Sequence, residues 1–283
     1  MAIILKGKPV ADEIYKDAEM RLQRLKDKNI APCLAVVRVG KDESSIAYED
    51  SVKKAFGKRG LNVKSCELPE DVSQDRLIEL IEKINADKNI HGCMVLRPLP
   101  RGMDENKILN HLKSKKDMDC VSRFSLGGVF SGDKDCYAPC TAEACMRILN
   151  YYNISLKGRR AAVIGRSLVV GRPLAIMLQA EDATITMCHS KSENMAEICR
   201  EQDILISAAG KEGLVKKEFV NENQIIIDVG INMGEDGKIH GDVDFSEAEP
   251  VVKAISPVPG GVGSVTTAIL AEHLLIAAER QSL

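Results

Sequence analysis

The stretch RAAVIGRSLVVGRPL at residues 160–174 decides the fold prediction. Its apolar start predicts a short buried strand that ends at Gly165. Pro173 suits the first turn of a helix, where its missing N–H costs nothing, so a helix is expected from Gly171. The free N–H groups at such a helix start suit the pyrophosphate of a dinucleotide. The spacing between the two glycines is GxxxxxG rather than GxGxxG, so an ordinary βα turn remains an alternative.

Strand-like and helix-like runs alternate on both sides of this stretch. The predicted strands are residues 33–39, 61–68, 92–96, 160–165, 184–188, 204–208 and 224–229, and the predicted helices are 10–26, 44–59, 74–86, 141–152, 171–179, 193–201 and 266–280. Such alternation predicts βαβ units and mostly parallel sheets. A segment rich in Gly, Ser, Asp and Lys, residues 117–139, is the expected domain junction.

Length and pattern together predict an α/β protein of two domains, because 283 residues exceed what one hydrophobic core usually serves. The first is an N-terminal αβα substrate domain, residues 1–139, completed by the C-terminal helix 266–283. The second is a Rossmann-type NAD(P)-binding domain, residues 140–265.

Composition excludes several function classes. The net charge is −2, aromatic residues make up 4% and Trp is absent, which argues against nucleic-acid binding. No run of 18 apolar residues predicts a membrane span, and the first residues do not resemble a signal peptide, so a cytoplasmic protein is expected. The nine cysteines are scattered without a CxxC pair, which indicates reduced thiols and no metal site.

The predicted strand 184–188 favours NADP over NAD. In NAD-specific folds the corresponding strand usually ends in an acid that binds the ribose hydroxyls. Here it ends Met-Cys-His-Ser-Lys, without a carboxylate. Arg166, Ser190 and Lys191 are cationic or hydroxyl groups suited to a 2′-phosphate, and a solvated Lys191 is the alternative. The glycine-rich loop PVPGGVG at 257–263 is expected to line the ligand cleft.

In order and in combination, the motifs resemble the methylenetetrahydrofolate dehydrogenase/cyclohydrolase family along nearly the whole chain. The matching segments are KDMD at 116–119, PCT at 139–141, GRSLVVGRP at 165–173, CHS at 188–190, DVGIN at 228–232, GDVDF at 241–245 and PVPGGVG at 257–263. The resemblance implies NADP-linked oxidation of 5,10-methylenetetrahydrofolate and hydrolysis of the methenyl product to 10-formyltetrahydrofolate. It also implies a homodimer and no metal.

The resemblance assigns roles to residues of both domains. Tyr48 would stack on the pterin, and Asp119 would hydrogen-bond its amino-pyrimidine edge. The cofactor-binding residues would be Gly165, Arg166, Ser167, Ser190 and Ile231, and the residues lying against the folate would be Pro259, Gly260 and Gly261.

The chain departs from the family at two catalytic positions. The family carries a Lys four residues after the Tyr, and this chain has Val52 there, about 40° from Tyr48 around a helix. The Gln that supports that Lys is replaced by Leu96, and the next residue, Arg97, is a candidate substrate contact. The Gly usual after the second Asp is Cys120.

These departures affect the two reactions differently. Hydride transfer depends mainly on the proximity and orientation of two rings. Hydrolysis needs a positioned water and proton transfer, which Val and Leu cannot supply. The sequence therefore predicts a dehydrogenase with weak or absent cyclohydrolase activity. The alternatives are a fully bifunctional enzyme in which Arg97 or Lys53 replaces the lost Lys, and a non-catalytic binding protein.

Overall fold

The computed structural model describes residues 1–282, which divide into two compact units. The six-stranded unit comprises Met1–Glu13 and Pro139–Thr266. The three-stranded unit comprises Ile14–Ala138 and the chain from Thr267 onward. Within the described residues, no helix is long and apolar enough to cross a membrane.

The six-stranded unit is built on one parallel sheet with the strand order β1-β11-β8-β7-β5-β6. These strands are β1 Ile3–Ile4, β5 Arg160–Ile164, β6 Thr184–Cys188, β7 Ile204–Ser207, β8 Ile225–Asp228 and β11 Ala254–Ile255. The chain runs from β5 to β6 on one side and then returns to β7 on the other. The strand order therefore reverses at β5, where ligands of open α/β sheets bind, and the expected Rossmann-type domain is confirmed.

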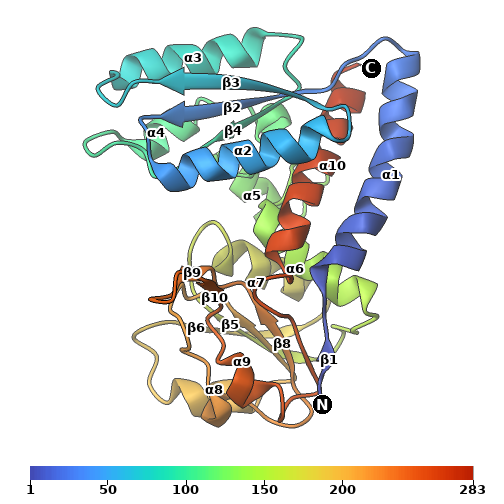
Figure 1. The fold of residues 1–283 in the computed structure, drawn as a ribbon, viewed down its shortest axis with the longest axis vertical. Helices are drawn as coiled ribbons and strands as arrows, with labels where there is room; N and C mark the ends of the chain where they lie inside the picture. Colours follow the sequence, from blue (N-terminus) through green and yellow to red (C-terminus); the bar gives the residue numbers. More distant parts are fainter. Residues whose placement is uncertain (283) are drawn as a thin grey trace. The chain divides into compact units, whose positions relative to one another are not determined.

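Helices and a hairpin complete this unit. They are α6 Cys140–Tyr151, α7 Gly171–Ala180, α8 Met195–Arg200, α9 Phe245–Ala248, the 3₁₀ turn Lys217–Phe219, and a hairpin of β9 Asn232–Met233 with β10 Ile239–His240. Helix α7 connects β5 to β6, and α8 connects β6 to β7 (Figure 1).

The start of the chain belongs to this unit, which corrects the expected first domain of residues 1–139. Strand β1 pairs in parallel with β11, and the backbone N–H of Ile3 donates to the Lys253 carbonyl at 3.0 Å. The N–H of Leu5 donates to the Ile255 carbonyl at 2.8 Å. Two residues are too few to show an alternating pattern, so only the tertiary pairing reveals this strand.

The three-stranded unit has the parallel order β3-β2-β4, with β2 Cys33–Val39, β3 Asn62–Leu68 and β4 Gly92–Val95. Its helices are α2 Glu43–Gly57, α3 Gln74–Ala86, α4 Glu105–Leu109, α5 Arg123–Ser131, and most of α1 Gly7–Asp27 and α10 Gly263–Gln281. Side chains of α3 and α4 pack on the sheet face that carries Ala35, Val37 and Val95. Helix α2 covers the other face, so the expected αβα arrangement is confirmed (Figure 1).

The expected junction 117–139 contains a helix, which the sequence pattern did not predict. Ser122 caps α5 by accepting a hydrogen bond from the Ser125 N–H at 3.2 Å, and Gly132 ends it with φ of 72°. Gly127 and Gly128 lie inside α5. Because glycine is a poor helix former, a sequence with two adjacent glycines is typical of a loop rather than a helix. A Cβ at Gly128 would collide with Cys136, so close packing explains that glycine.

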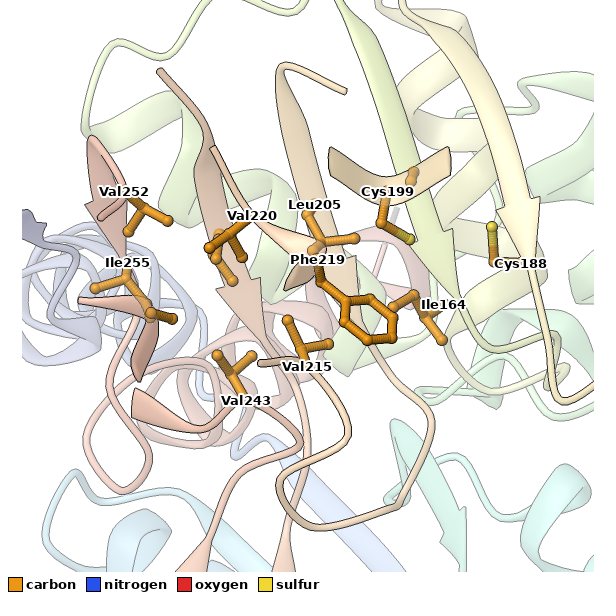
Figure 2. Close-up of a cluster of buried hydrophobic side chains, with 13 residues drawn as sticks. Ile164, Cys188, Cys199, Leu205, Val215, Phe219, Val220, Val243, Val252 and Ile255 are labelled. Carbon is orange, nitrogen blue, oxygen red and sulfur yellow. The ribbon is translucent and has the colours of Figure 1, made fainter. Parts of the chain in front are cut away.

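A cluster of buried apolar side chains stabilises the six-stranded unit (Figure 2). Phe219 contributes the largest of these side chains, beside Ile164 of β5 and Val215. Strands β5, β7 and β8 supply aliphatic residues from the sheet. The cluster therefore holds the strands whose carboxyl ends carry the loops described below.

We expect Phe219→Ala to lower the free energy of unfolding by about 3–5 kcal/mol, because it leaves a cavity in this cluster. The matched control is Phe245→Ala in the same unit, since Phe245 is 39% exposed and Phe219 only 8%. Urea unfolding followed by circular dichroism measures both. Equal losses for the two variants would contradict the prediction.

Candidate functional site

Gly165 forms the tight turn that follows β5. Its φ is 120°, a backbone conformation that residues with a side chain rarely adopt. A Cβ at this position would collide with the carbonyl oxygen of Ala208, which follows β7. The backbone of the predicted nucleotide turn therefore crosses next to the neighbouring strand end, at the point where the strand order reverses.

The start of α7 faces this turn and has no side-chain cap. Ser167 holds the turn from within, because its hydroxyl accepts a hydrogen bond from the Val170 N–H at 3.1 Å. A Cβ at Gly171 would collide with the Gly165 carbonyl, so the helix start packs tightly against the turn. Arg166 and Ser167 are exposed. The N–H groups of this helix start are already engaged, since Gly171 donates to Ser167 Oγ at 3.5 Å and Arg172 to the Ser167 carbonyl at 3.0 Å. The feature that suits an anionic pyrophosphate is therefore the partial positive charge of the helix start rather than free N–H groups.

Ser190 follows β6, whose last residue, Cys188, accepts a hydrogen bond from the Gly165 N–H at 2.9 Å. Strand pairing thus brings Ser190 and Lys191 to the sheet edge that carries Gly165. Ser190 and Lys191 are exposed. The acid typical of NAD-specific folds is absent there, as the sequence shows.

Asp242 organises the loop after β7, a role the sequence analysis missed. It is fully buried. Its carboxylate accepts hydrogen bonds from Ser207 Oγ at 3.1 Å, the N–H groups of Ala209 at 2.7 Å, Gly210 at 3.2 Å and Lys211 at 2.9 Å, and Asn232 Nδ2 at 3.1 Å. Its sequence signal was its place in the segment GDVDF at 241–245, which the family resemblance includes.

Asp228, the last residue of β8, holds the adjacent loops. Its carboxylate accepts from the N–H groups of Gly230 at 2.9 Å, Asp242 at 3.0 Å and Val243 at 3.0 Å. Burial raises the pKa of Asp228 to about 6, although these three hydrogen bonds lower it, and the neighbouring Asp242 carboxylate raises it further. Two buried carboxylates thus fix the backbone at the carboxyl edge of the sheet.

A pocket of about 250 Å³ lies beside Asp228 in the same unit. It is lined by Ile231 and by the loop 257–263, so the structure brings the predicted cofactor residue Ile231 together with Pro259, Gly260 and Gly261. The loop is irregular, as expected, and the N–H of Gly7 donates to the Gly260 carbonyl at 2.8 Å.

Tyr48 and Val52 lie on α2 in the three-stranded unit. Helix α2 is α-helical throughout Glu43–Gly57, without a bulge that would shift Lys53 into the position of Val52. Val52 is 0% exposed and belongs to the buried face of α2, whereas Tyr48 is exposed.

Leu96 directly follows β4, and Asp119 lies two residues after Asp117, which is bridged to the same strand. Side chains alternate along a strand, and Val95 faces α3, so Leu96 faces the α2 side, where it is 8% exposed. An isolated parallel bridge joins Cys93 of β4 to Asp117, and Asp119 lies in the turn that follows Asp117. Leu96 and Val52 therefore share one apolar layer.

The two cations named as substitutes for the missing Lys are engaged elsewhere. Lys53 Nζ pairs with Glu49 Oε1 at 2.8 Å, on the side of α2 that faces β3 rather than β4. Arg97 Nη1 lies 3.6 Å from Glu105 Oε1 of α4. Arg97 lies beyond the end of β4, and its predicted contact with substrate stays a prediction.

Cys120 has a φ of 55°, in the left-handed region that favours glycine, the residue that the family resemblance leads us to expect at this position. The turn is held by Asp117, whose carboxylate accepts from the N–H groups of Val121 and Ser122, both at 2.9 Å. The backbone that carries Asp119 thus keeps the glycine-type turn.

Gly165→Ala should weaken NADP binding at least about tenfold, because the new Cβ pushes the turn away from Ala208. Calorimetric titration with NADP measures the dissociation constant. The control is Gly237→Ala, which also has a positive φ, 74° against 120° at Gly165, but open space around the added Cβ. It should lose stability by about 1–2 kcal/mol without losing affinity. Unchanged affinity in Gly165→Ala would contradict the assignment.

Comparison with known proteins identifies the family to which this chain belongs. A model of the tetrahydrofolate dehydrogenase/cyclohydrolase catalytic domain matches residues 5–119, and one of the NAD(P)-binding domain of the same family matches residues 139–282. A relative named "Bifunctional protein FolD", from Clostridium botulinum, is 46% identical over the whole of both chains.

Two solved structures agree with this result. Bifunctional FolD from Campylobacter jejuni is 38% identical and superposes with a TM-score of 0.97, covering 99% of both chains. FolD from Trypanosoma brucei, complexed with NADP cofactor and an inhibitor, is 33% identical with a TM-score of 0.93, covering 99% of this chain and 98% of that one. The chain belongs to the tetrahydrofolate dehydrogenase/cyclohydrolase family.

Proposed function

We propose that this protein oxidises 5,10-methylenetetrahydrofolate to 5,10-methenyltetrahydrofolate with NADP. The observation that carries the proposal is the Gly165 turn at the strand-order reversal, next to a β6 end without a carboxylate. The NADP named for the Trypanosoma brucei relative supports the same cofactor.

The chain's residues would bind NADP and the folate and would orient their rings toward each other. Gly165, Arg166, Ser167, Ser190 and Ile231 would hold NADP, whose nicotinamide, when bound, accepts the hydride.

On the folate side, Tyr48 would stack on the pterin and Asp119 would hydrogen-bond its amino-pyrimidine edge. Pro259, Gly260 and Gly261 would lie against the substrate. The positive charge left on the methenyl product is delocalised over the folate's own nitrogens, so no side-chain acid or base is required. Orientation of two rings then accounts for most of the rate. A homodimer stays a prediction.

Hydrolysis of the methenyl product is the second candidate activity. The relatives named "Bifunctional protein FolD" favour it, and a fully bifunctional enzyme fits their names at least as well as a dehydrogenase alone. The opposing observation is that Val52 and Leu96 are buried and apolar. Because neither can polarise the substrate or move a proton, we propose that hydrolysis is slow in this chain.

Both reactions should be measured on one preparation, with NADP and with NAD. We expect NADP reduction with methylenetetrahydrofolate, preference for NADP over NAD of at least about tenfold, and hydrolysis of methenyltetrahydrofolate near the buffer rate. Absence of NADP reduction would overturn the dehydrogenase proposal. Hydrolysis far above the buffer rate would establish the bifunctional alternative.

The double variant Val52→Lys/Leu96→Gln tests why hydrolysis is slow. A cation with a hydrogen-bonding partner should raise the hydrolysis rate by about 10²-fold, while dehydrogenase activity changes little. The control is Val52→Met/Leu96→Met, which alters size without adding a polar group. Thermal unfolding of both variants shows whether the buried Lys has disrupted the unit. Equal hydrolysis by a folded double variant and the wild type would contradict this explanation.

A further inference from the structure

The buried face of α2 carries one charged residue, Glu49, directly after Tyr48. The other members of this face are Ser45, Val52 and Phe56. Apolar contacts have no direction, so Val52 and Phe56 hold the helix against the sheet without fixing its position along its axis. A charged group with several partners in fixed directions supplies the missing constraint.

Glu49 links α2 to both neighbouring strands. Its Oε2 accepts a hydrogen bond from Arg38 Nε of β2 at 2.9 Å. Its Oε1 accepts from Ser65 Oγ of β3 at 2.6 Å and from Lys53 Nζ of α2 at 2.8 Å. Both carboxylate oxygens are therefore used, although the Glu49 side chain is only 2% exposed.

Arg38 is fixed in turn by the end of its own strand and by β3. Its guanidinium donates to the Gly40 carbonyl and lies 3.0 Å from Glu67 Oε2. Burial raises the pKa of Glu49, but the hydrogen bonds from Lys53, Ser65 and Arg38 outweigh it and hold the pKa at about 2. The pair is thus ionised at neutral pH.

We propose that the Glu49–Arg38 pair is a positioning device that sets Tyr48 for folate binding. The proposal rests on the proposed dehydrogenase function. Tyr48 precedes Glu49 by one residue, so a shift of α2 along the sheet would move the Tyr48 ring by the same amount. Neither Glu49 nor Arg38 contacts substrate in this scheme, and they act through Tyr48.

Glu49→Gln is the first test, because an amide –NH₂ would face a cation or a hydroxyl donor in place of one carboxylate oxygen. We expect the dissociation constant for tetrahydrofolate, measured by calorimetry, and the KM for methylenetetrahydrofolate to rise about tenfold. The KM for NADP and kcat should stay within about twofold. The control is Asp50→Asn, an exposed acid on the same helix 3.9 Å from Lys53, which should leave all four values unchanged.

Arg38→Met/Glu49→Leu separates positioning from simple stability. Apolar replacement of a buried ion pair often preserves or raises stability. We expect this variant to recover the Tm lost in Glu49→Gln while the folate constants stay high. Recovery of folate affinity together with Tm would overturn the proposal, because the pair would then act only on stability.

Glu49→Gln in a Tyr48→Leu variant tests whether Glu49 acts on folate binding through Tyr48. If Glu49 acts through Tyr48, Glu49→Gln should weaken folate binding no further there, and additive effects would overturn the proposal. A wild type that binds tetrahydrofolate without reducing NADP would refute the dehydrogenase function, while the binding constants still test Glu49. A wild type that neither binds nor reacts overturns both.

Discussion

The carboxyl edge of the six-stranded sheet depends on the hydrogen bonds accepted by Asp242. A buried carboxylate without partners would be costly, and here five donors from two segments, residues 207–211 and Asn232, satisfy it. The consequence is a rigid loop after β7, against which the Gly165 turn packs. A nucleotide site built from backbone groups requires such rigidity, because N–H groups bind an anion well only when their directions are fixed beforehand.

In the three-stranded unit, a pair of oppositely charged side chains fixes the position of α2 on the sheet. Its sheet face under α2 combines an apolar layer with the Glu49–Arg38 pair. Buried ion pairs contribute little net stability relative to apolar residues. The Glu49–Arg38 pair is therefore better explained by the fixed position that it gives to α2 on the sheet. In the same unit Lys53 is tied to Glu49, and its charge is directed toward β3.

Long periodic segments were predictable from sequence, and short ones were not. Strands β2 to β8 and the turn at Gly165 follow from apolar runs, whereas the two-residue strand β11 was not predicted. Strand β1 and the hairpin of β9 and β10 have two residues per strand, which is too short for any pattern. Helix α5 was missed because its two glycines imitate a loop. Among site residues, the glycine turn was found from the apolar run before Gly165 and from Pro173 after it. Asp228 and Asp242 were missed as organisers, because their importance comes from backbone donors that only the folded chain assembles.

Strand β1 also has a consequence for the margin of its sheet. It occupies the outer side of β11, and a chain lacking residues 1–5 would leave the backbone groups of Lys253 and Ile255 without these partners. Exposed strand edges are templates for pairing with other molecules. The first residues of this protein therefore cover the edge of β11 as a short edge strand. Because β1 has only two residues, it exposes few unpaired backbone groups of its own.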